Sequence, residues 1–225
     1  MNNYIVATVK DWNIERFNNI TAGLPGNWHL ITEKNELTVH RLREISPRYV
    51  FFPHWSWIVP EDVLTEFECV CFHMADVPYG RGGSPLQNLI IRGHKDTKLS
   101  ALRMTNELDA GPVYMKQPLS LEGAAKDIFL RCSDLTYEMI AKIVDSEPKP
   151  KKQSGEVLEF KRRTPKQSEL PADVSLEKIY DIIRMLDADT YPRAFIKHGD
   201  FNIEFSNAEL EGDNALTATV KLTKQ

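Results

Sequence analysis

Residues 69–85, Cys69-Val-Cys-Phe-His73-Met-Ala-Asp-Val-Pro-Tyr-Gly-Arg81-Gly-Gly-Ser-Pro85, combine a strand, a loop and the start of a helix. The run up to His73 is apolar and alternating, which predicts a strand, and the Pro- and Gly-rich run after it predicts a tight loop. Ser84 and Pro85 are suited to the N-cap and first position of a helix that ends before Gly93. His73 therefore lies at the carboxyl end of a strand, where open α/β sheets bind their ligands.

Strands alternate with helices on both sides of this unit, which predicts a mostly parallel sheet covered on both faces. We expect strands at Tyr4–Val9, Trp28–Thr32, Tyr49–Phe52, Glu68–His73, Leu99–Asn106 and Val113–Leu119. We expect helices at Trp12–Ile20 (capped by Asp11), Val39–Ser46, Pro60–Phe67 and Gly123–Val144. The polar stretches Ser146–Gly155 and Phe160–Lys166 read as a connector. After it we expect a helix at Leu176–Leu186, capped by Ser175, and short strands at Ala194–Ile196, Asn202–Phe205 and Leu216–Leu222.

Composition indicates a soluble intracellular protein. The chain has 225 residues, 42% of them hydrophobic, and a formal net charge of −4, which argues against a general nucleic-acid binder. Its three cysteines, Cys69, Cys71 and Cys132, show no disulfide-framework spacing, and no apolar run reaches the ~18 residues of a membrane span. The amino terminus begins a strand at once, without the features of a signal peptide. We therefore expect a cytoplasmic protein.

Three motifs resemble the formyltransferase family that uses 10-formyltetrahydrofolate. Cys71-Phe-His73 stands where that family has Asn-x-His, Pro78–Pro85 resembles its Pro-x-x-Arg-Gly-x-x-Pro loop, and Leu108-Asp109-Ala-Gly111 resembles its Leu-Asp-x-Gly. The similarity runs from Tyr49 to near Ala208. It implies an α/β fold: a Rossmann-like formyltransferase core with a mostly parallel sheet (residues 1–158), then a small C-terminal α+β subdomain (residues 159–225) for acceptor binding or dimerisation.

The resemblance also implies a mechanism. An uncharged amine would attack the formyl carbon of 10-formyltetrahydrofolate, and the tetrahedral intermediate would expel the folate nitrogen. His73, whose side chain has an ordinary pKa near 6.5, would take up and return the proton, while Asp109 would orient the imidazole. Cys71 replaces the asparagine that donates to the oxyanion, and a thiol is a weak donor. Gln87, Asn88 and Asn106 are candidates to fill that role.

The remaining site residues are also inferred from the resemblance. Folate would contact Trp55, Trp57, Ile58, Leu108 and Asp109, and the acceptor would contact Arg81, Gly82, Tyr191 and Arg193. The region Asp187–Phe195 and the loop after His73 look most like nucleotide-sugar N-formyltransferases of the pseudaminic-acid-type pathway. The acceptor expected from this is a UDP-linked 4-amino-4,6-dideoxy-hexose in surface-glycan biosynthesis, in an enzyme that is a homodimer.

Other interpretations stay open at this point. Methionyl-tRNA formyltransferases resemble the chain but carry a longer C-terminal barrel. Cys71 could also mark a folate-binding relative without turnover, and a related hydrolase would pass the formyl group to water. Cys69, Cys71 and His73 share a strand face but lack a clear fourth ligand, so we expect no metal. Gly80-x-Gly-Gly lacks the context of a dinucleotide-binding fingerprint.

Overall fold

The structure, a computed structural model, describes residues 1–189, 191–212 and 214–224, and the chain forms two compact units. The first unit contains residues 1–81, 98–119 and 130–159, and the second contains residues 82–97, 120–129 and 160–225. The expected domain boundary after residue 158 stays a prediction.

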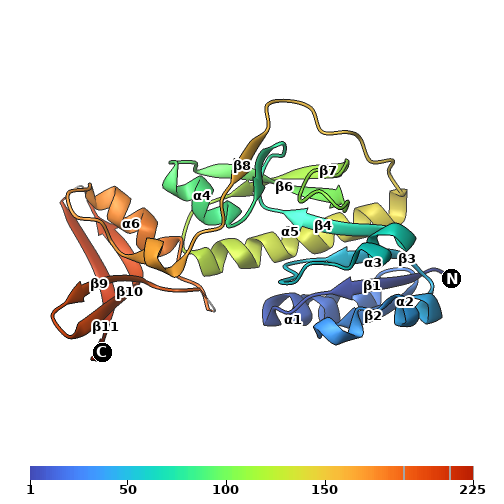
Figure 1. The fold of residues 1–225 in the computed structure, drawn as a ribbon, viewed down its shortest axis with the longest axis horizontal. Helices are drawn as coiled ribbons and strands as arrows, with labels where there is room; N and C mark the ends of the chain where they lie inside the picture. The colour runs from blue at the N-terminus through green and yellow to red at the C-terminus, as the bar shows by residue number, and fades with distance from the viewer. Residues whose placement is uncertain (190, 213, 225) are drawn as a thin grey trace. The chain divides into compact units, whose positions relative to one another are not determined.

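Six strands form one sheet in the order β2-β1-β3-β4-β6-β7 (Figure 1). Its strands are β1 (Asn3–Ala7), β2 (Asn27–Ile31), β3 (Pro47–Phe52), β4 (Cys69–His73), β6 (Asp96–Arg103) and β7 (Val113–Ser120). β1 pairs in parallel with β2 and β3, β3 pairs in parallel with β4, and β4 pairs antiparallel with β6. The predicted mostly parallel α/β sheet is confirmed.

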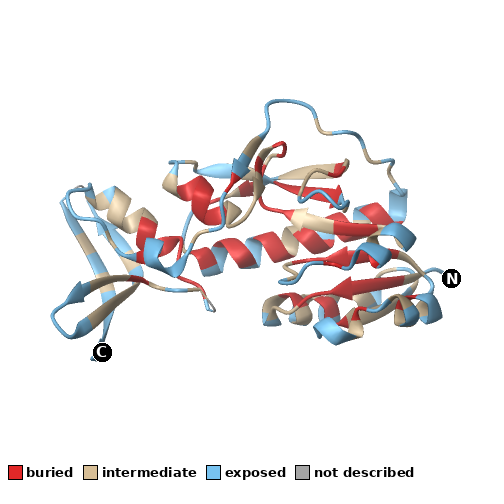
Figure 2. Ribbon diagram, viewed as in Figure 1, coloured by how far each residue is buried: buried red, intermediate tan, exposed pale blue. Residues whose placement is uncertain are grey.

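The helices are α1 (Asp11–Ile20), α2 (Val39–Ile45), α3 (Glu61–Glu66), α4 (Pro85–Ile91), α5 (Ala125–Ser146) and α6 (Leu176–Arg184). Short 3₁₀ turns occupy Thr21–Gly23, Lys34–Glu36 and Pro165–Ser168. Leu42 of α2 and Val63 of α3 belong to the same buried cluster as Ile5, Val50 and Phe52, so these two helices cover one face of the sheet. Figure 2 shows the buried residues concentrated along the central strands.

Ser84 is the N-cap residue of α4 and Pro85 its first residue, as predicted, although the Ser84 hydroxyl makes no capping bond and instead accepts from the Arg163 backbone N–H at 3.1 Å. Two other local predictions were wrong. Asp11 is not the N-cap of α1, because the helix begins at Asp11 itself and Lys10 precedes it. The loop after His73 contains a short strand, β5 (Tyr79–Gly82), which pairs with β8 (Leu158–Phe160) at the end of the expected connector.

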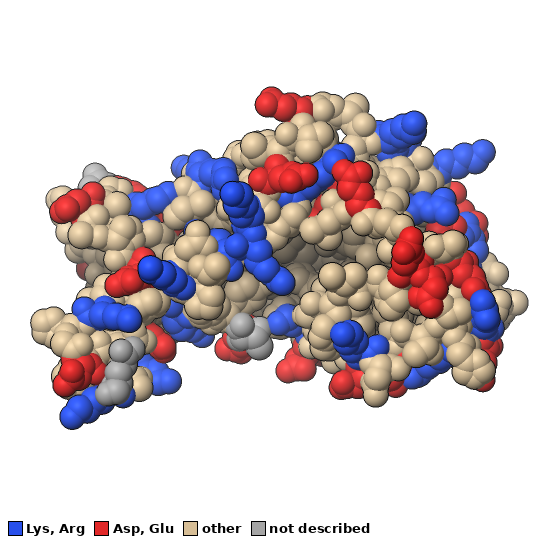
Figure 3. Space-filling view, viewed as in Figure 1, with Lys and Arg blue, Asp and Glu red and all other residues tan. Residues whose placement is uncertain are grey.

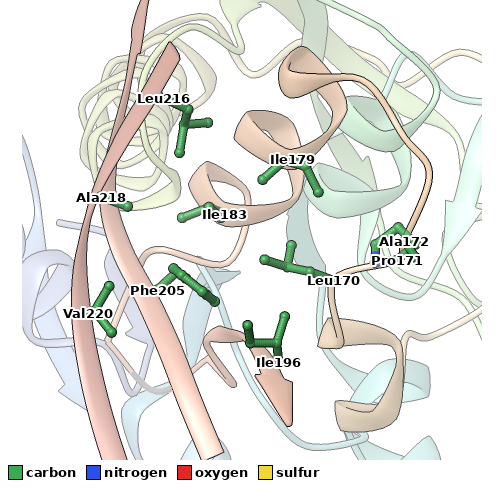
Figure 4. Close-up of a pocket in the computed structure, with 10 residues that line it drawn as sticks. All are labelled: Leu170, Pro171, Ala172, Ile179, Ile183, Ile196, Phe205, Leu216, Ala218 and Val220. Carbon is green, nitrogen blue, oxygen red and sulfur yellow. The ribbon is translucent and has the colours of Figure 1, made fainter. Parts of the chain in front are cut away.

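The C-terminal part of the chain is a small α+β subdomain, as predicted. β9 (Ala194–His198), β10 (Phe201–Glu211) and β11 (Ala215–Lys224) form an antiparallel sheet in the order β11-β10-β9. The hydroxyl of Ser175 caps α6 by accepting from the Lys178 N–H at 3.3 Å. A groove of about 520 Å³ lies between α6 and this sheet (Figure 4); it is lined by Leu170, Pro171, Ala172, Ile179, Ile183, Ile196, Phe205, Leu216, Ala218 and Val220.

No helix in the described part of the chain is long and apolar enough to cross a membrane. Dimerisation through the C-terminal strands stays a prediction.

Candidate active site

His73 ends β4, and its ring contacts two acceptor groups. Nδ1 lies 3.4 Å from Oδ2 of Asp109, and Nε2 lies 2.6 Å from the backbone oxygen of Gly80. A carbonyl oxygen only accepts, so Nε2 carries a proton in this arrangement. Nδ1 of the neutral ring is then an acceptor, and it can donate to the carboxylate only after it has taken up a proton. The imidazole is only 8% exposed, and the contact with Gly80 and the end of β4 hold it in place.

The 3.4 Å separation between His73 and Asp109 is longer than an ordinary hydrogen bond. Catalytic pairs are often loose before the substrate binds and tighten in the complex. A carboxylate at this place can orient the ring and stabilise it when it carries a second proton. The pair expected from the sequence is thus brought together, although its two members come from β4 and from the loop between β6 and β7.

Cys71 lies one pleat before His73 and lines a cavity of about 40 Å³ that Asp109 and Gly111 also line. Burial, followed by the negative charge of Asp109, raises the pKa of the Cys71 thiol. The group therefore stays a neutral thiol at physiological pH, which makes it a weak hydrogen-bond donor rather than a nucleophile. The structure places this weak donor where the sequence resemblance expects an asparagine.

The three proposed substitutes for that asparagine donate elsewhere. The amide of Gln87 donates to the Met185 oxygen at 3.2 Å, and that of Asn88 donates to the backbone oxygens of Gly83, Ser84 and Lys161. The amide of Asn106 donates to Glu61 at 2.7 Å. The structure therefore favours none of them as the oxyanion donor.

The loop that carries Asp109 is shaped by close backbone packing. Asp109 adopts a left-handed conformation with φ of 53°, which is uncommon for a residue other than glycine. A Cβ atom at Gly111 would lie 1.7 Å from the backbone oxygen of Arg103, so only glycine fits there. The close packing of the Arg103 backbone oxygen against residue 111 explains why the Leu-Asp-Ala-Gly motif ends in glycine.

Three side chains that no sequence motif marks hold the loop after His73 and the loop that carries Asp109. The hydroxyl of Ser100 donates to the Ala75 oxygen at 2.7 Å, and the ammonium of Lys116 contacts the Val77 oxygen and the Asp76 carboxylate. Gln153 contacts the Asp109 loop from the stretch that the sequence predicts as a connector. Periodicity and local motifs do not report these contacts, because the partners lie on segments that are distant in the sequence.

The predicted folate contacts lie in two loops of the first unit. Trp55 and Trp57 meet edge to face with ring centroids 4.9 Å apart, and Trp55 packs against the buried cluster that Cys71 also touches. Apolar side chains on these loops are exposed: Trp57 is 38%, Leu108 70% and Ile58 92% accessible. Leu108 directly precedes Asp109, and exposed apolar side chains next to a titratable pair are typical of a ligand site.

The predicted acceptor contacts are engaged within the chain. Arg81 donates from Nε to Gln153 at 3.1 Å and lies 3.4 Å from Glu107. A Cβ atom at Gly82 would lie 2.5 Å from the Phe160 oxygen. The Tyr191 ring stacks on Phe129 with centroids 5.3 Å apart, and Arg193 pairs with Asp187 and, at 3.8 Å, with Asp189. Thr190, within the same motif, lies outside the described residues. Their grouping into one acceptor site stays a prediction.

Within the described residues, no group of three or more His, Cys, Asp or Glu side chains is arranged to hold a metal ion.

The fold and the histidine–carboxylate site define a formyltransferase-type protein, and comparisons with known proteins agree. A solved structure of methionyl-tRNA formyltransferase from Clostridium thermocellum is 46% identical, with a TM-score of 0.97 and coverage of 100% of both chains. The family model described as methionyl-tRNA formyltransferase, C-terminal domain, matches residues 165–223. The chain belongs to the formyltransferase family.

More distant relatives match over less of their length. Methionyl-tRNA formyltransferase of Rickettsia felis is 26% identical over 185 residues, which are 79% of this chain and 60% of the relative. Among the curated relatives, the matched share of their own length ranges from 37% to 64%. A 4-N formyltransferase from Francisella tularensis has a TM-score of 0.69 and 15% identity, covering 88% of this chain and 93% of that one; it shows the fold alone.

These comparisons overturn the predicted nucleotide-sugar acceptor and its role in surface-glycan biosynthesis. The full-length relative at 46% identity carries the methionyl-tRNA name, whereas the sugar enzyme shares only 15% of its residues. The physical reason is local: Tyr191 and Arg193, which suggested a sugar nucleotide, make packing and ion-pair contacts inside the C-terminal unit. The expectation that nucleic acid is an improbable partner rests on the net charge and on the short C-terminal region. The relative named methionyl-tRNA formyltransferase matches over the whole of both chains, so neither ground argues against tRNA.

Proposed function

We propose that this protein transfers a formyl group from 10-formyltetrahydrofolate to the amino group of methionyl-tRNA. The observation that carries the proposal is the 46% identity, over the whole of both chains, to a protein named methionyl-tRNA formyltransferase. The His73–Asp109 pair supports the reaction class independently, because amine acylation needs a group that takes up and returns a proton.

The loops beside His73 and Asp109 fit a folate. The indole N–H of Trp55 is buried and has no hydrogen-bond partner among the described residues, so a ligand acceptor atom would satisfy it. Trp57, Ile58 and Leu108 add exposed apolar surface for a flat ring system. The bound folate would supply the activated formyl group.

His73 and Asp109 have distinct roles in this proposal. His73 removes the proton of the attacking amine at Nδ1, the ring nitrogen that does not donate to Gly80. Asp109, 3.4 Å from the same nitrogen, stabilises the imidazolium that forms. The proton then returns to the leaving nitrogen. The neutral thiol of Cys71 donates only weakly to the developing oxyanion, so this position gives the oxyanion little stabilisation.

Local charge is compatible with a tRNA acceptor despite the net charge of −4. Lys161, Arg162 and Lys166 are exposed in the stretch that follows β8, and Figure 3 shows basic side chains gathered over this part of the face. Binding to phosphate depends on such local groups rather than on the chain's net charge.

The direct test incubates the protein with 10-formyltetrahydrofolate and methionyl-tRNA and measures formyl-methionyl-tRNA by mass spectrometry. A UDP-linked 4-amino-6-deoxy sugar and a reaction without acceptor run in parallel. Formyl-methionyl-tRNA supports the proposal. Folate release without acceptor would instead indicate a hydrolase, and folate binding without any product would indicate a non-catalytic relative.

His73→Ala and Asp109→Asn test the assigned roles. We expect each to lower turnover by at least about 100-fold, because proton transfer of this kind contributes roughly 10²–10⁴-fold. His40→Ala, on a side chain that is 87% exposed, serves as the matched histidine control and should retain wild-type turnover. Near-normal turnover in both site variants would remove the assignment.

A further inference from the structure

Gln153 joins the two loops that flank the candidate site. Its side-chain nitrogen donates to the backbone oxygens of Asp109 and Gly111, both at 2.8 Å. Its side-chain oxygen accepts from Nε of Arg81 at 3.1 Å. Both amide N–H groups and the amide oxygen are therefore used, and all three partners lie on loops next to His73.

Gln153 differs from its neighbours in the chain, because its side chain is turned toward the protein and theirs are turned toward solvent. In residues 151–157 every side chain is exposed except Gln153, which is half-buried. The segment is tied at both ends: Lys151 exchanges two backbone hydrogen bonds with Val113, of 2.7 and 2.8 Å, and the Leu158 N–H donates to Pro78 at 3.2 Å. The stretch between α5 and β8 thus runs as a strap along both loops, and Gln153 is the residue it turns inward.

The backbone that Gln153 holds is a strained one. Asp109 has φ of 53°, a conformation that costs roughly 1–3 kcal/mol for a non-glycine residue and persists only where its surroundings fix it. The side-chain amide of Gln153 fixes this conformation through its two hydrogen bonds to the backbone oxygens of Asp109 and Gly111. The carboxylate of Asp109 depends on this backbone for its position 3.4 Å from His73.

We propose that Gln153 is a positioning residue for the formyl transfer proposed above, on which this inference rests. Gln153 fixes the Asp109 loop against the Arg81 loop, and this keeps the Asp109 carboxylate at its place beside the His73 ring. It touches neither substrate. Its effect passes through Asp109.

Gln153→Glu removes the hydrogen bonds that Gln153 donates to the Asp109 loop but keeps the one that it accepts from Arg81. A carboxylate still accepts from Arg81 but cannot donate to the oxygens of Asp109 and Gly111. We expect kcat to fall by about 10- to 100-fold, the effect of a misplacement of about 1 Å, while KM for folate and acceptor changes less than about 2-fold. Lys152→Gln, on the exposed neighbour, is the matched control and should leave both constants unchanged.

Two measurements distinguish positioning from a general loss of structure. In an Asp109→Asn background, Gln153→Glu should lower kcat by less than about 2-fold, because its effect passes through the carboxylate that is already gone. An additive loss, or a change in KM alone, would overturn the proposal.

Hydrogen exchange keeps this test independent of the proposed reaction. Gln153→Glu should speed amide exchange in a peptide covering residues 105–112 while leaving the β1–β3 peptides unchanged. Unchanged exchange at 105–112 would overturn the positioning role. If exchange at 105–112 became faster but the protein formed no formylated product, the role of Gln153 in fixing the loop would be supported and only the proposed formyl transfer would be rejected.

Discussion

At the scale of single residues, Cys71 is the residue expected to limit how well the candidate site stabilises an oxyanion. Its thiol lines the same small cavity as Asp109 and is held neutral by burial and by that carboxylate. An asparagine amide in its place would offer a stronger N–H donor to an oxyanion. The residue that departs from the family motif is therefore expected to govern rate rather than folding.

Cys71→Asn should raise kcat. One oxyanion donor contributes about 2.7–4 kcal/mol in well-studied enzymes, so an increase of up to roughly 1,000-fold is available. Steady-state kinetics with saturating folate and methionyl-tRNA measures it. Cys71→Ala removes the thiol without adding a donor and should show no increase. An equal rise in both variants would mean that relief of crowding, not hydrogen bonding, limits the wild-type enzyme.

At the scale of elements, the loop between β6 and β7 depends on Gly111. The Arg103 oxygen occupies the space that any side chain would need, and the Arg103 N–H also donates to Pro112 at 2.9 Å. A side chain would thus push apart two hydrogen-bonded segments. The geometry of Asp109, two residues earlier, would change with them.

Gly111→Ala should lower kcat at least about 10-fold and destabilise the protein by roughly 1–3 kcal/mol, the usual cost of overpacking. Urea unfolding and kinetics report the two effects. Gly23→Ala is the matched control: a Cβ there meets nothing within 4 Å, so its unfolding free energy should change by less than about 0.5 kcal/mol. If Gly111→Ala behaved like Gly23→Ala, the close approach to Arg103 would not constrain the loop.

The elements also differ in how well the sequence predicts them. β1, β3 and β4 are short apolar runs that are buried along most of their length, so the sheet was predictable. β5 and β8 are short, and their pairing depends on contact between distant segments, which periodicity does not report. His73 and Asp109 were identifiable from motif spacing, whereas Gln153 was not, because its partners lie on segments more than 40 residues away and two of the three are backbone oxygens. The acceptor was mispredicted because a short motif around Tyr191 and the average charge were given too much weight.

At the scale of the whole molecule, one buried polar cluster links three elements. Asn13 of α1 accepts from the hydroxyl of Ser133 on α5 at 2.6 Å, and its backbone oxygen accepts from Tyr137 at 2.7 Å. Its side-chain nitrogen lies 3.2 Å from Nδ1 of His54, which follows β3 in a left-handed conformation with φ of 52°. Because an amide nitrogen only donates, His54 accepts at Nδ1 and is neutral in the folded state.

The cluster should make global stability depend on pH. Burial first, and the charge of Lys10 second, lower the pKa of His54 from 6.5 to about 4. The unfolded chain therefore binds the proton more readily, so the contribution of His54 is complete above pH 6.5 and is lost as the pH falls from 6.5 toward 4. The full difference is about 3 kcal/mol, of which about 2 kcal/mol should be lost by pH 5.

Urea unfolding at pH 7.5 and pH 5 tests this for the wild type and for His54→Asn, which preserves an acceptor and tolerates positive φ. The wild type should lose about 2 kcal/mol more than His54→Asn between the two pH values, because only the wild type must exclude a proton from the cluster. His40→Asn, on a side chain that is 87% exposed, should follow the wild type. Equal pH dependence in the wild type and His54→Asn would show that the link between α1, β3 and α5 does not require a neutral imidazole.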